Sequence, residues 1–393
     1  MILENIIYFI WKLFQCYIGF NLIMPIFLLS IYFIKSTKKQ TFNKSNFEEA
    51  DYAIIVTAYE QTDLLEGVTN SLLQLNYSNY LIYIVADKCD ISNLFFDDDR
   101  VILLRPEETL ASNTRSHFYA INHFKRPHER LTIIDSDNLV HPEYINELNN
   151  FFDKGFNAVQ GLRAAKSLNT LYAALDAARD IYYHFYDGKV LFSVGSSATL
   201  AGSGMAFTVK LYKDCLAHLD ITGAGFDKIL QKQIVDKGYR IAFAEHAIVY
   251  DEKTAHSDQL INQRARWINT WFKYFSFGFS LFAKGVVNFS WNQLLFGLVL
   301  LRPPLFIFLL LSICCFIINL FFNPFIATLW FCAILFFTIG FFLSLLLNKA
   351  DPKVYKSLWG IPKFVFFQLL SLMQVGNANK RSVATKHYHD KAD

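Results

Sequence analysis

The sequence lacks a cysteine pattern and a strong excess of either charge. Its six cysteines stand at unrelated spacings. Four of them lie inside apolar segments: Cys16, Cys314, Cys315 and Cys332. A disulfide framework or a zinc site would need cysteines at regular spacings, so neither is predicted. The formal net charge is only +3, and a broad basic surface for nucleic acid is therefore not expected.

The sequence also lacks the glycine-rich fingerprints of common nucleotide-binding proteins. From about residue 52 to residue 255, apolar strand-like runs alternate with helical patterns, which is typical of a parallel sheet covered by helices. Residues 52–58 and 80–86 are predicted strands, and residues 63–75 are the predicted helix between them. Neither strand is followed by G-x-G-x-x-G or G-x-x-x-x-G-K-[ST], so a dinucleotide-binding or P-loop protein is not expected.

Long hydrophobic runs are abundant, and they gather at the two ends of the chain. Hydrophobic residues make up 53% of the 393 residues. Residues 16–34 are long and apolar enough to cross a bilayer, whereas a cleaved signal peptide would have a shorter run and a small-x-small cleavage site. Four lysines follow: Lys35, Lys38, Lys39 and Lys44. By the positive-inside rule, we expect a retained anchor with the next domain in the cytoplasm.

The last third of the chain has the same apolar character. Residues 294–322 and 325–347 are predicted to span the membrane, with a tight turn at residues 323–324 between them. Residues 271–287 are interrupted by two lysines and a glycine, which favours an interfacial location. Residues 358–373 are shorter and precede a basic tail, so an in-plane or re-entrant segment is favoured over a third crossing.

Two carboxylates stand one residue apart at the end of an apolar run in the middle of the chain. Residues 131–134 read as a buried strand, which would deliver Asp135 and Asp137 to its carboxyl end, where open α/β sheets bind ligands. Both side chains would project the same way and could hold one Mg²⁺ or Mn²⁺ ion. Such an ion keeps positions free for the phosphate oxygens of a nucleotide. The alternative is an Asp-rich turn without a ligand.

Polar residues also follow the other predicted strands. Thr57 and Glu60 follow the first strand, and Asp87 ends the second, where its carboxylate could accept hydrogen bonds from a base or a ribose. Each could equally be a solvated loop residue. Farther on, residues 202–207 combine glycines with an apolar run, and Gly204 would permit a close approach of the backbone to a ligand. A structural bend explains that run nearly as well.

The last candidates lie before and within two helical patterns. Asp227 precedes an amphipathic pattern, where it is either a first-turn helix residue or a general base for an acceptor hydroxyl. Gln263, Arg266 and Trp267 would share one helix face, because they stand at positions i, i+3 and i+4. Amide and guanidinium donors suit a diphosphate, and an indole suits a sugar ring. An amphipathic helix at a membrane surface would also contain such residues.

The order of these features resembles the membrane-bound family 2 glycosyltransferases, which are relatives of cellulose, chitin and hyaluronan synthases and of ceramide glucosyltransferase. Their pattern is written D, DxD, D, QxxRW, and the resemblance covers about residues 52–271. It implies an α/β domain of the GT-A type, with a mixed, mostly parallel sheet flanked by transmembrane helices. The implied divisions are an anchor at 1–45, a cytoplasmic glycosyltransferase domain at 46–268, interfacial helices at 269–291, a transmembrane region at 292–376 and a basic tail at 377–393.

The resemblance also implies a role for each candidate. Asp135 and Asp137 would hold the metal, and Asp227 would be the catalytic base. The implied donor-binding residues are Thr57, Glu60, Asp87, Asp135, Gln263 and Arg266, and the implied acceptor-binding residues are Gly204 and Trp267. The sequence departs from the pattern at Phe226, where the family often has Glu, and at Asp90, which could exchange roles with Asp87.

The resemblance therefore predicts a metal-dependent, inverting glycosyltransferase at the cytoplasmic membrane face. It would move a sugar from a nucleotide-sugar donor, UDP-linked in the favoured case, to a lipid-linked or saccharide acceptor. The main alternative is a processive polysaccharide synthase that exports its product, although three expected crossings are few for a polymer channel unless partner membrane proteins contribute. An alternative of another class is a membrane-tethered nucleotide-sugar binding protein without turnover.

Overall fold

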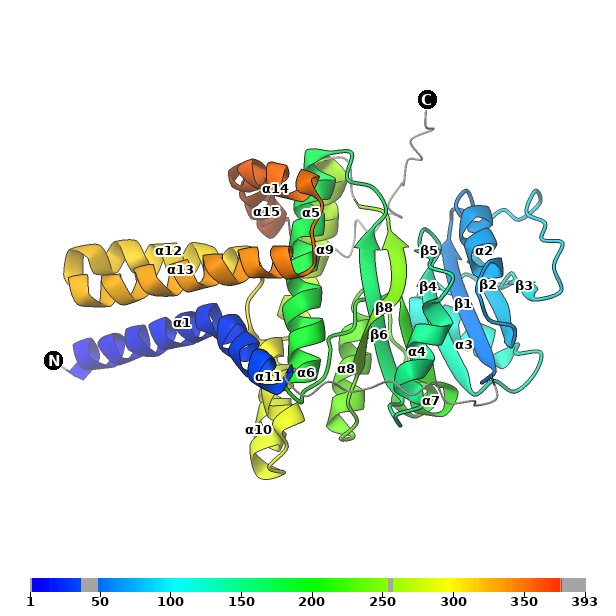
Figure 1. Cartoon of the computed structure of the whole chain (residues 1–393), viewed down its shortest axis with the longest axis horizontal. Coiled ribbons are helices and arrows are strands. Elements are labelled where there is room, and N and C mark those ends of the chain that lie inside the picture. The colour runs from blue at the N-terminus through cyan, green and yellow to red at the C-terminus, as the bar shows by residue number, and fades with distance from the viewer. Residues whose placement is uncertain (1, 37–48, 254–256, 375, 377–393) are drawn as a thin grey trace.

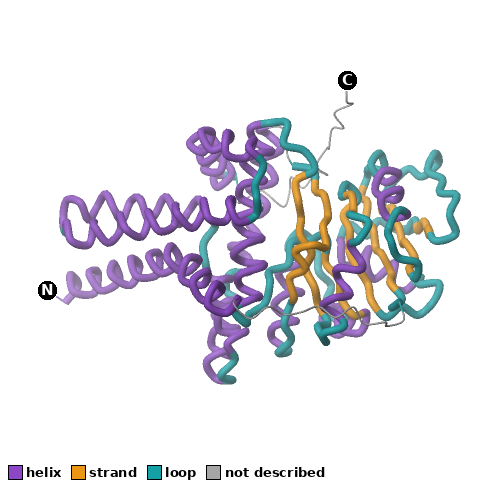
Figure 2. The backbone as a smooth tube through the Cα atoms, viewed as in Figure 1, coloured by secondary structure: helices purple, strands orange, loops and turns teal. Residues whose placement is uncertain are grey.

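The computed structural model describes residues 2–36, 49–253, 257–374 and 376. The expected basic tail at 377–393 and the lysines that follow Lys35 lie outside these described residues. One mixed sheet organises the middle of the chain (Figures 1 and 2), in the strand order β3-β2-β1-β4-β7-β6-β8-β5. Its strands are β1 Tyr52–Tyr59, β2 Tyr80–Asp87, β3 Val101–Leu104, β4 Arg130–Asp135, β5 Leu139–Val140, β6 Ala158–Ala165, β7 Met205–Thr208 and β8 Ala242–Asp251.

The predicted α/β fold with a mixed, mostly parallel sheet is confirmed. Strands β3, β2, β1 and β4 run parallel to one another, and so do β6 and β8, whereas β7 and β5 pair antiparallel with their neighbours. In the parallel half, Thr57 of β1 pairs with Asp135 of β4, and Tyr59 pairs with Asp87 of β2. This register brings the three predicted polar strand ends to one edge of the sheet.

Both faces of the sheet are buried, because alternate residues of each strand point to opposite sides. Ile54 and Val56 of β1 pack with α2 (Leu65–Leu73) and α4 (Tyr144–Phe152). Ala53 and Ile55 pack in the other core, to which α3 (Asn113–Asn122), α7 (Val209–Leu216) and α8 (Phe226–Asp236) contribute. Burial on both faces explains why these strands are continuous apolar runs in the sequence.

Among the described residues, three helices are long and apolar enough to cross a membrane: α1 (Ile2–Ser36), α12 (Leu305–Phe322) and α13 (Pro324–Leu347). They lie side by side and project away from the sheet (Figure 1). Helix α1 begins well before the predicted residue 16, and it changes direction part-way along, as expected for a helix that contains Pro25. Helix α13 and the turn before it match the prediction.

The predicted single span at 294–322 is wrong. The structure divides it into α11 (Trp291–Leu301) and α12, with Arg302, Pro303 and Pro304 between them. Two consecutive prolines remove backbone donors, and the buried guanidinium of Arg302 bonds the carboxylate of Asp187. A helix that continued through residues 302–304 would lack the backbone hydrogen bonds of the two prolines, and it would separate Arg302 from Asp187. Only the second half, α12, is long enough to cross a membrane.

The remaining helices gather around the end of the apolar helices that is nearer the sheet (Figure 1). In chain order they are α5 (Leu171–Tyr183), the π-helix η1 (His184–Val190), α6 (Leu191–Ser193), α9 (Ser257–Tyr274), α10 (Phe277–Val287), α14 (Pro352–Ser357), the 3₁₀-helix η2 (Leu358–Gly360) and α15 (Ile361–Met373). The predicted in-plane segment at 358–373 is thus η2 and α15, a helix of 13 residues. Phe364 of α15 is buried against Leu175 of α5 and Leu260 of α9.

Candidate active site

A cavity of about 1450 Å³ lies at the carboxyl ends of β1, β2 and β4. It extends from these strand ends past α8, α9 and α5 to the apolar helices α12 and α13. Candidates that are far apart in the sequence line this one space. They are Thr57, Asp87, Asp135, Asp137, Asp227, Gln263, Arg266 and Trp267. The fold therefore brings the acidic strand ends, the start of α8 and one face of α9 together.

Asp135 is the most perturbed acid of this group. It is the last residue of β4, and its backbone N–H donates to the buried Ser203 Oγ at 3.0 Å. Burial raises the pKa of its carboxyl to about 7, with the charges of Asp137, Asp251 and Asp227 adding to the rise and Arg163 acting against it. Negative charge is therefore crowded at the end of β4, and a cation would stabilise it.

The two carboxylates of Asp135 and Asp137 fit a divalent cation that takes most of its oxygens from elsewhere. Within the described part of the chain, no group of three or more His, Cys, Asp or Glu side chains could hold a metal ion. Mg²⁺ is commonly held by one or two carboxylates together with substrate phosphates and water. The donor set suits an ion that arrives with a nucleotide better than a permanent structural metal.

Asn138 was not among the sequence candidates, yet it positions Asp137. Its side chain is fully buried, and its amide donates to Asp137 Oδ1 at 2.8 Å and to Asp251 Oδ1 at 3.3 Å. Burial opposes the charge of Asp251, but Arg163 and Lys253 outweigh it and lower the pKa of this carboxyl to about 2. Asp251 of β8 therefore holds the Asn138 amide in place, and this amide in turn positions Asp137.

Asp227 lies in the first turn of α8, on the cavity wall. Lys228 Nζ lies 3.0 Å from Asp227 Oδ2 and also donates to the Leu200 carbonyl at 3.2 Å. The preceding Gly225 has φ of +99°, and a Cβ there would lie 2.6 Å from the Tyr274 ring and 2.7 Å from Thr270 of α9. Only glycine permits this approach, which holds the start of α8 against α9.

Helix α9 carries Gln263, Arg266 and Trp267 to the cavity. Burial lowers the pKa of the Arg266 guanidinium, and the charge of Asp135 acts in the opposite direction, so the two groups interact across the site. The guanidinium carbons of Arg264 and Arg179 lie 4.3 Å and 4.4 Å from the centre of the Trp267 ring system. The indole, expected to stack on a sugar, therefore already contacts two cations.

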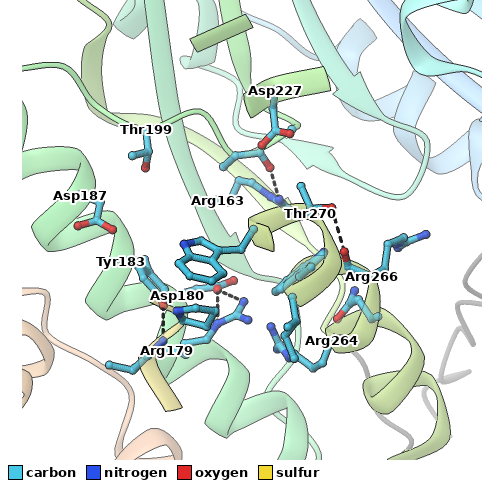
Figure 3. Close-up of a pocket in the computed structure, with 18 of the residues that line it drawn as sticks. Arg163, Arg179, Asp180, Tyr183, Asp187, Thr199, Asp227, Arg264, Arg266 and Thr270 are labelled. Carbon is cyan, nitrogen blue, oxygen red and sulfur yellow. Dashed lines mark hydrogen bonds and ion pairs between the residues drawn. The ribbon is translucent and has the colours of Figure 1, made fainter. Parts of the chain in front are cut away.

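A chain of buried ion pairs connects α9 to the strand ends, and Figure 3 shows four of its members, Arg163, Arg179, Asp180 and Arg264. Arg264 is 2% exposed, and its guanidinium bonds the carboxylate of Asp176. The chain continues through contacts of 2.5 to 3.1 Å, in the order Asp176, Arg179, Asp180, Lys253, Asp251 and Arg163. Its members come from α5, β6, β8 and the segment after β8, so no local sequence pattern revealed them.

Two candidates lie outside the cavity lining. Glu60 has φ of +59°, and its carboxylate pairs with Lys88 at 2.7 Å. Gly204 belongs to the sheet, since its N–H donates to the Ile133 carbonyl at 2.9 Å and its carbonyl accepts from Gly161 N–H at 2.8 Å. Both residues therefore have structural partners within the protein, and the donor contact expected for Glu60 and the acceptor contact expected for Gly204 stay predictions.

Asp87 lines the cavity, but its carboxylate already has partners. Its two oxygens accept from the backbone N–H groups of Leu110 and Ala111 at 2.9 and 2.8 Å. The carboxylate therefore holds the loop before α3, and only its remaining lone pairs would face a ligand. Asp90, the alternative to Asp87, accepts from both the N–H and the hydroxyl of Ser92 instead.

Comparison with known proteins gives one family match. The model described as "Glycosyltransferase like family 2" matches residues 50–270, which include the sheet and all the candidate residues. No curated protein sequence matches the chain.

Several solved structures are similar to parts of the fold. The mannosyltransferase PcManGT from Pyrobaculum calidifontis, in complex with GDP-Man and Mn²⁺, is 12% identical with a TM-score of 0.47, covering 91% of this chain and 98% of that one. TarS from S. aureus is 15% identical with a TM-score of 0.38, covering 55% of this chain. A TarS 1–349 structure with UDP-GlcNAc has the same identity and TM-score, covering 52% of this chain. The chain spans 39% and 59% of the lengths of these two TarS chains.

Proposed function

Because the chain belongs to glycosyltransferase family 2, we propose that it transfers a sugar from a nucleotide-sugar donor to a lipid-linked or saccharide acceptor, with inversion at the anomeric carbon. The observation that carries the proposal is that Asp135, Asp137, Asp227 and Arg266 line one cavity at the carboxyl edge of the sheet. A metal-bound diphosphate, a base and a cation for the leaving group are the parts that such a transfer needs.

The proposed reaction is a single in-line displacement. Asp227 takes the proton of the acceptor hydroxyl while its oxygen bonds to the anomeric carbon of the sugar. The bond from that carbon to the diphosphate oxygen breaks, and the electron pair leaves with the nucleoside diphosphate. The Arg266 guanidinium and the Gln263 amide donate to the departing phosphates. Asp135 and Asp137 would hold Mg²⁺ or Mn²⁺, which offsets the diphosphate charge.

The proposed donor is UDP-linked, with Thr57 and Asp87 on the nucleoside side of the cavity. Arg179 and Arg264 would hold Trp267 beside the acceptor by their contacts with its indole. Trp267 would then contact the acceptor through the edge of its indole ring, and the acceptor would not stack on the face of the ring.

We also propose that the catalytic domain lies on the cytoplasmic side. In Figure 1 the start of α1 and the turn between α12 and α13 both lie at the end farthest from the sheet, as expected if both are on the outer side. Lys35, at the other end of α1, donates to the Val194 carbonyl at 3.0 Å, beside the sheet domain. This arrangement agrees with the positive-inside rule.

Donor screening tests the proposal. The full chain in lipid nanodiscs is incubated with radiolabelled UDP- and GDP-sugars and Mn²⁺, with and without a chelator. We expect transfer of single sugars that is lost with the chelator and restored by added metal. A long polymer would instead support the processive alternative, and donor binding without release of nucleoside diphosphate would support the non-catalytic one.

A further inference from the structure

The cavity continues far beyond the residues that the reaction needs. At one end it is lined by Asp135 and Asp227, and at the other by side chains of α12, α13 and α15. We name this second part the apolar end, defined by Leu309, Thr338, Phe341, Phe342, Phe364 and Val365. Two of its three helices are candidate membrane spans. The catalytic centre is therefore in direct continuity with space between membrane helices.

We infer that the acceptor is an amphiphile whose hydrocarbon chain lies in the apolar end while its hydroxyl reaches Asp227. The inference rests on the proposed function, and it selects the lipid-linked acceptor over the saccharide. A saccharide that entered the apolar end would leave most of its hydroxyls without hydrogen-bond partners, because five of the six defining side chains are hydrocarbon. Burial of unpaired hydroxyls is unfavourable, whereas burial of methylene groups is favourable.

A buried ion pair marks the boundary between the two parts of the cavity. Arg302 and Asp187 are 6% and 5% exposed, and they bond each other where α11 ends and α12 is about to begin. The two charges of the pair cancel, so the boundary has polar atoms but no net charge. The segment that joins the polar head of the acceptor to its hydrocarbon chain would lie against these atoms. Beyond it, Pro303 and Pro304 begin the apolar lining.

The position of Trp359 agrees with a cavity that opens to lipid. Its side chain lines the cavity and is 92% exposed, and Lys356 and Lys363 are its exposed neighbours along the chain. Tryptophan and lysine are favoured where hydrocarbon meets the lipid headgroups. A lipid acceptor could then enter sideways from the bilayer with its head near η2 and its chain between α13 and α15.

Native mass spectrometry of the full chain with butyl, octyl and dodecyl β-glucosides tests the inference. Each buried methylene is expected to strengthen binding by about fourfold, less where the chain is only partly enclosed. We expect one saturable site whose half-saturating concentration falls at least about tenfold from butyl to octyl. Leu309→Trp fills the apolar end and should raise the octyl value about tenfold. Ile313→Trp, on the same helix but outside the cavity lining, should not change it.

A second pair of variants, on another helix, keeps the test valid if Leu309→Trp does not fold. Thr338→Phe fills the apolar end from α13, and Ile339→Phe is its control on the lipid-facing side. Binding that ignores chain length, or equal effects of the filling and control variants, would overturn the inference. Release of nucleoside diphosphate from the donor is measured separately on the wild-type chain. If it fails while chain-length-dependent binding persists, the proposed function is wrong and the lipid site remains.

Discussion

Loss of the Arg264 side chain should loosen α9 from the rest of the site. Arg264 bonds Asp176 of α5, both residues are buried, and the Arg264 guanidinium also lies over the Trp267 ring. In Arg264→Met, Asp176 stays buried and loses this partner, while its contact with Arg179 at 3.1 Å remains. Removing one partner of a buried ion pair costs ~3–5 kcal/mol, because the other charge stays out of water.

The expected loss is large enough to measure by thermal unfolding in detergent. A loss of this size corresponds to a fall in Tm of ~6–20 °C, at about 2–4 °C per kcal/mol for a domain of this class. Sugar transfer should fall as well, since α9 carries Gln263 and Arg266. The double variant Asp176→Leu with Arg264→Met removes both charges, and it should recover at least about half of the lost stability.

A surface pair provides the matched control. Arg115 pairs with Asp220 at 2.7 Å, but both side chains are well exposed. Arg115→Met should therefore change the unfolding free energy by at most ~1 kcal/mol. If Arg264→Met is as stable as the control variant, or if the double variant is less stable than Arg264→Met, the buried pair does not anchor α9 and the reasoning fails.

Two further variants test the packing of α8 and the burial of a histidine. Gly225→Ala should lower transfer at least about tenfold by pushing α8 from α9. Gly223→Ala introduces the same kind of backbone strain, at a φ of +77°, but meets no atom within 4 Å of its Cβ, so it should lower transfer less than Gly225→Ala. Burial lowers the pKa of His117 to about 3. The unfolded chain therefore binds the extra proton below about pH 6.5, so stability is full above that pH and falls by ~1.4 kcal/mol per unit down to pH 3. Between pH 7 and pH 5, thermal unfolding should show that the unfolding free energy falls as the pH falls. His117→Gln should reduce this slope, whereas His123→Gln, at an exposed position, should retain it. Equal slopes for the two variants would contradict the burial argument.

Local sequence patterns were sufficient for three neighbouring strands of the sheet, β1, β2 and β4, and for the polar edge at which they end. The strands that end at Tyr59, Asp87 and Asp135 are short apolar runs, buried on both faces, which no amphipathic helix would show. Because parallel strands end at one edge, the clustering of Thr57, Asp87 and Asp135 followed from the order of elements alone.

Contacts between distant segments explain what the sequence did not reveal. Asn138 positions Asp137 through Asp251, a residue 113 positions later, and the Arg264–Asp176 pair joins residues 88 positions apart. The break after α11 depends on Asp187, which satisfies the buried Arg302 from another helix. For Gly204 the sequence left a ligand loop and a structural bend open, because glycine has the same sequence signature in both, and only the structure shows its hydrogen bonds within the sheet.

The account depends most on Asp227 as the base, and Asp227→Asn tests it directly. With the donor found by screening, transfer by the variant should fall by ~10²–10⁴-fold, while donor affinity measured by calorimetry stays near that of the wild type. Asp214→Asn, an exposed substitution on α7, should change neither quantity. Full transfer by Asp227→Asn would remove Asp227 from the chemistry and contradict the proposed mechanism.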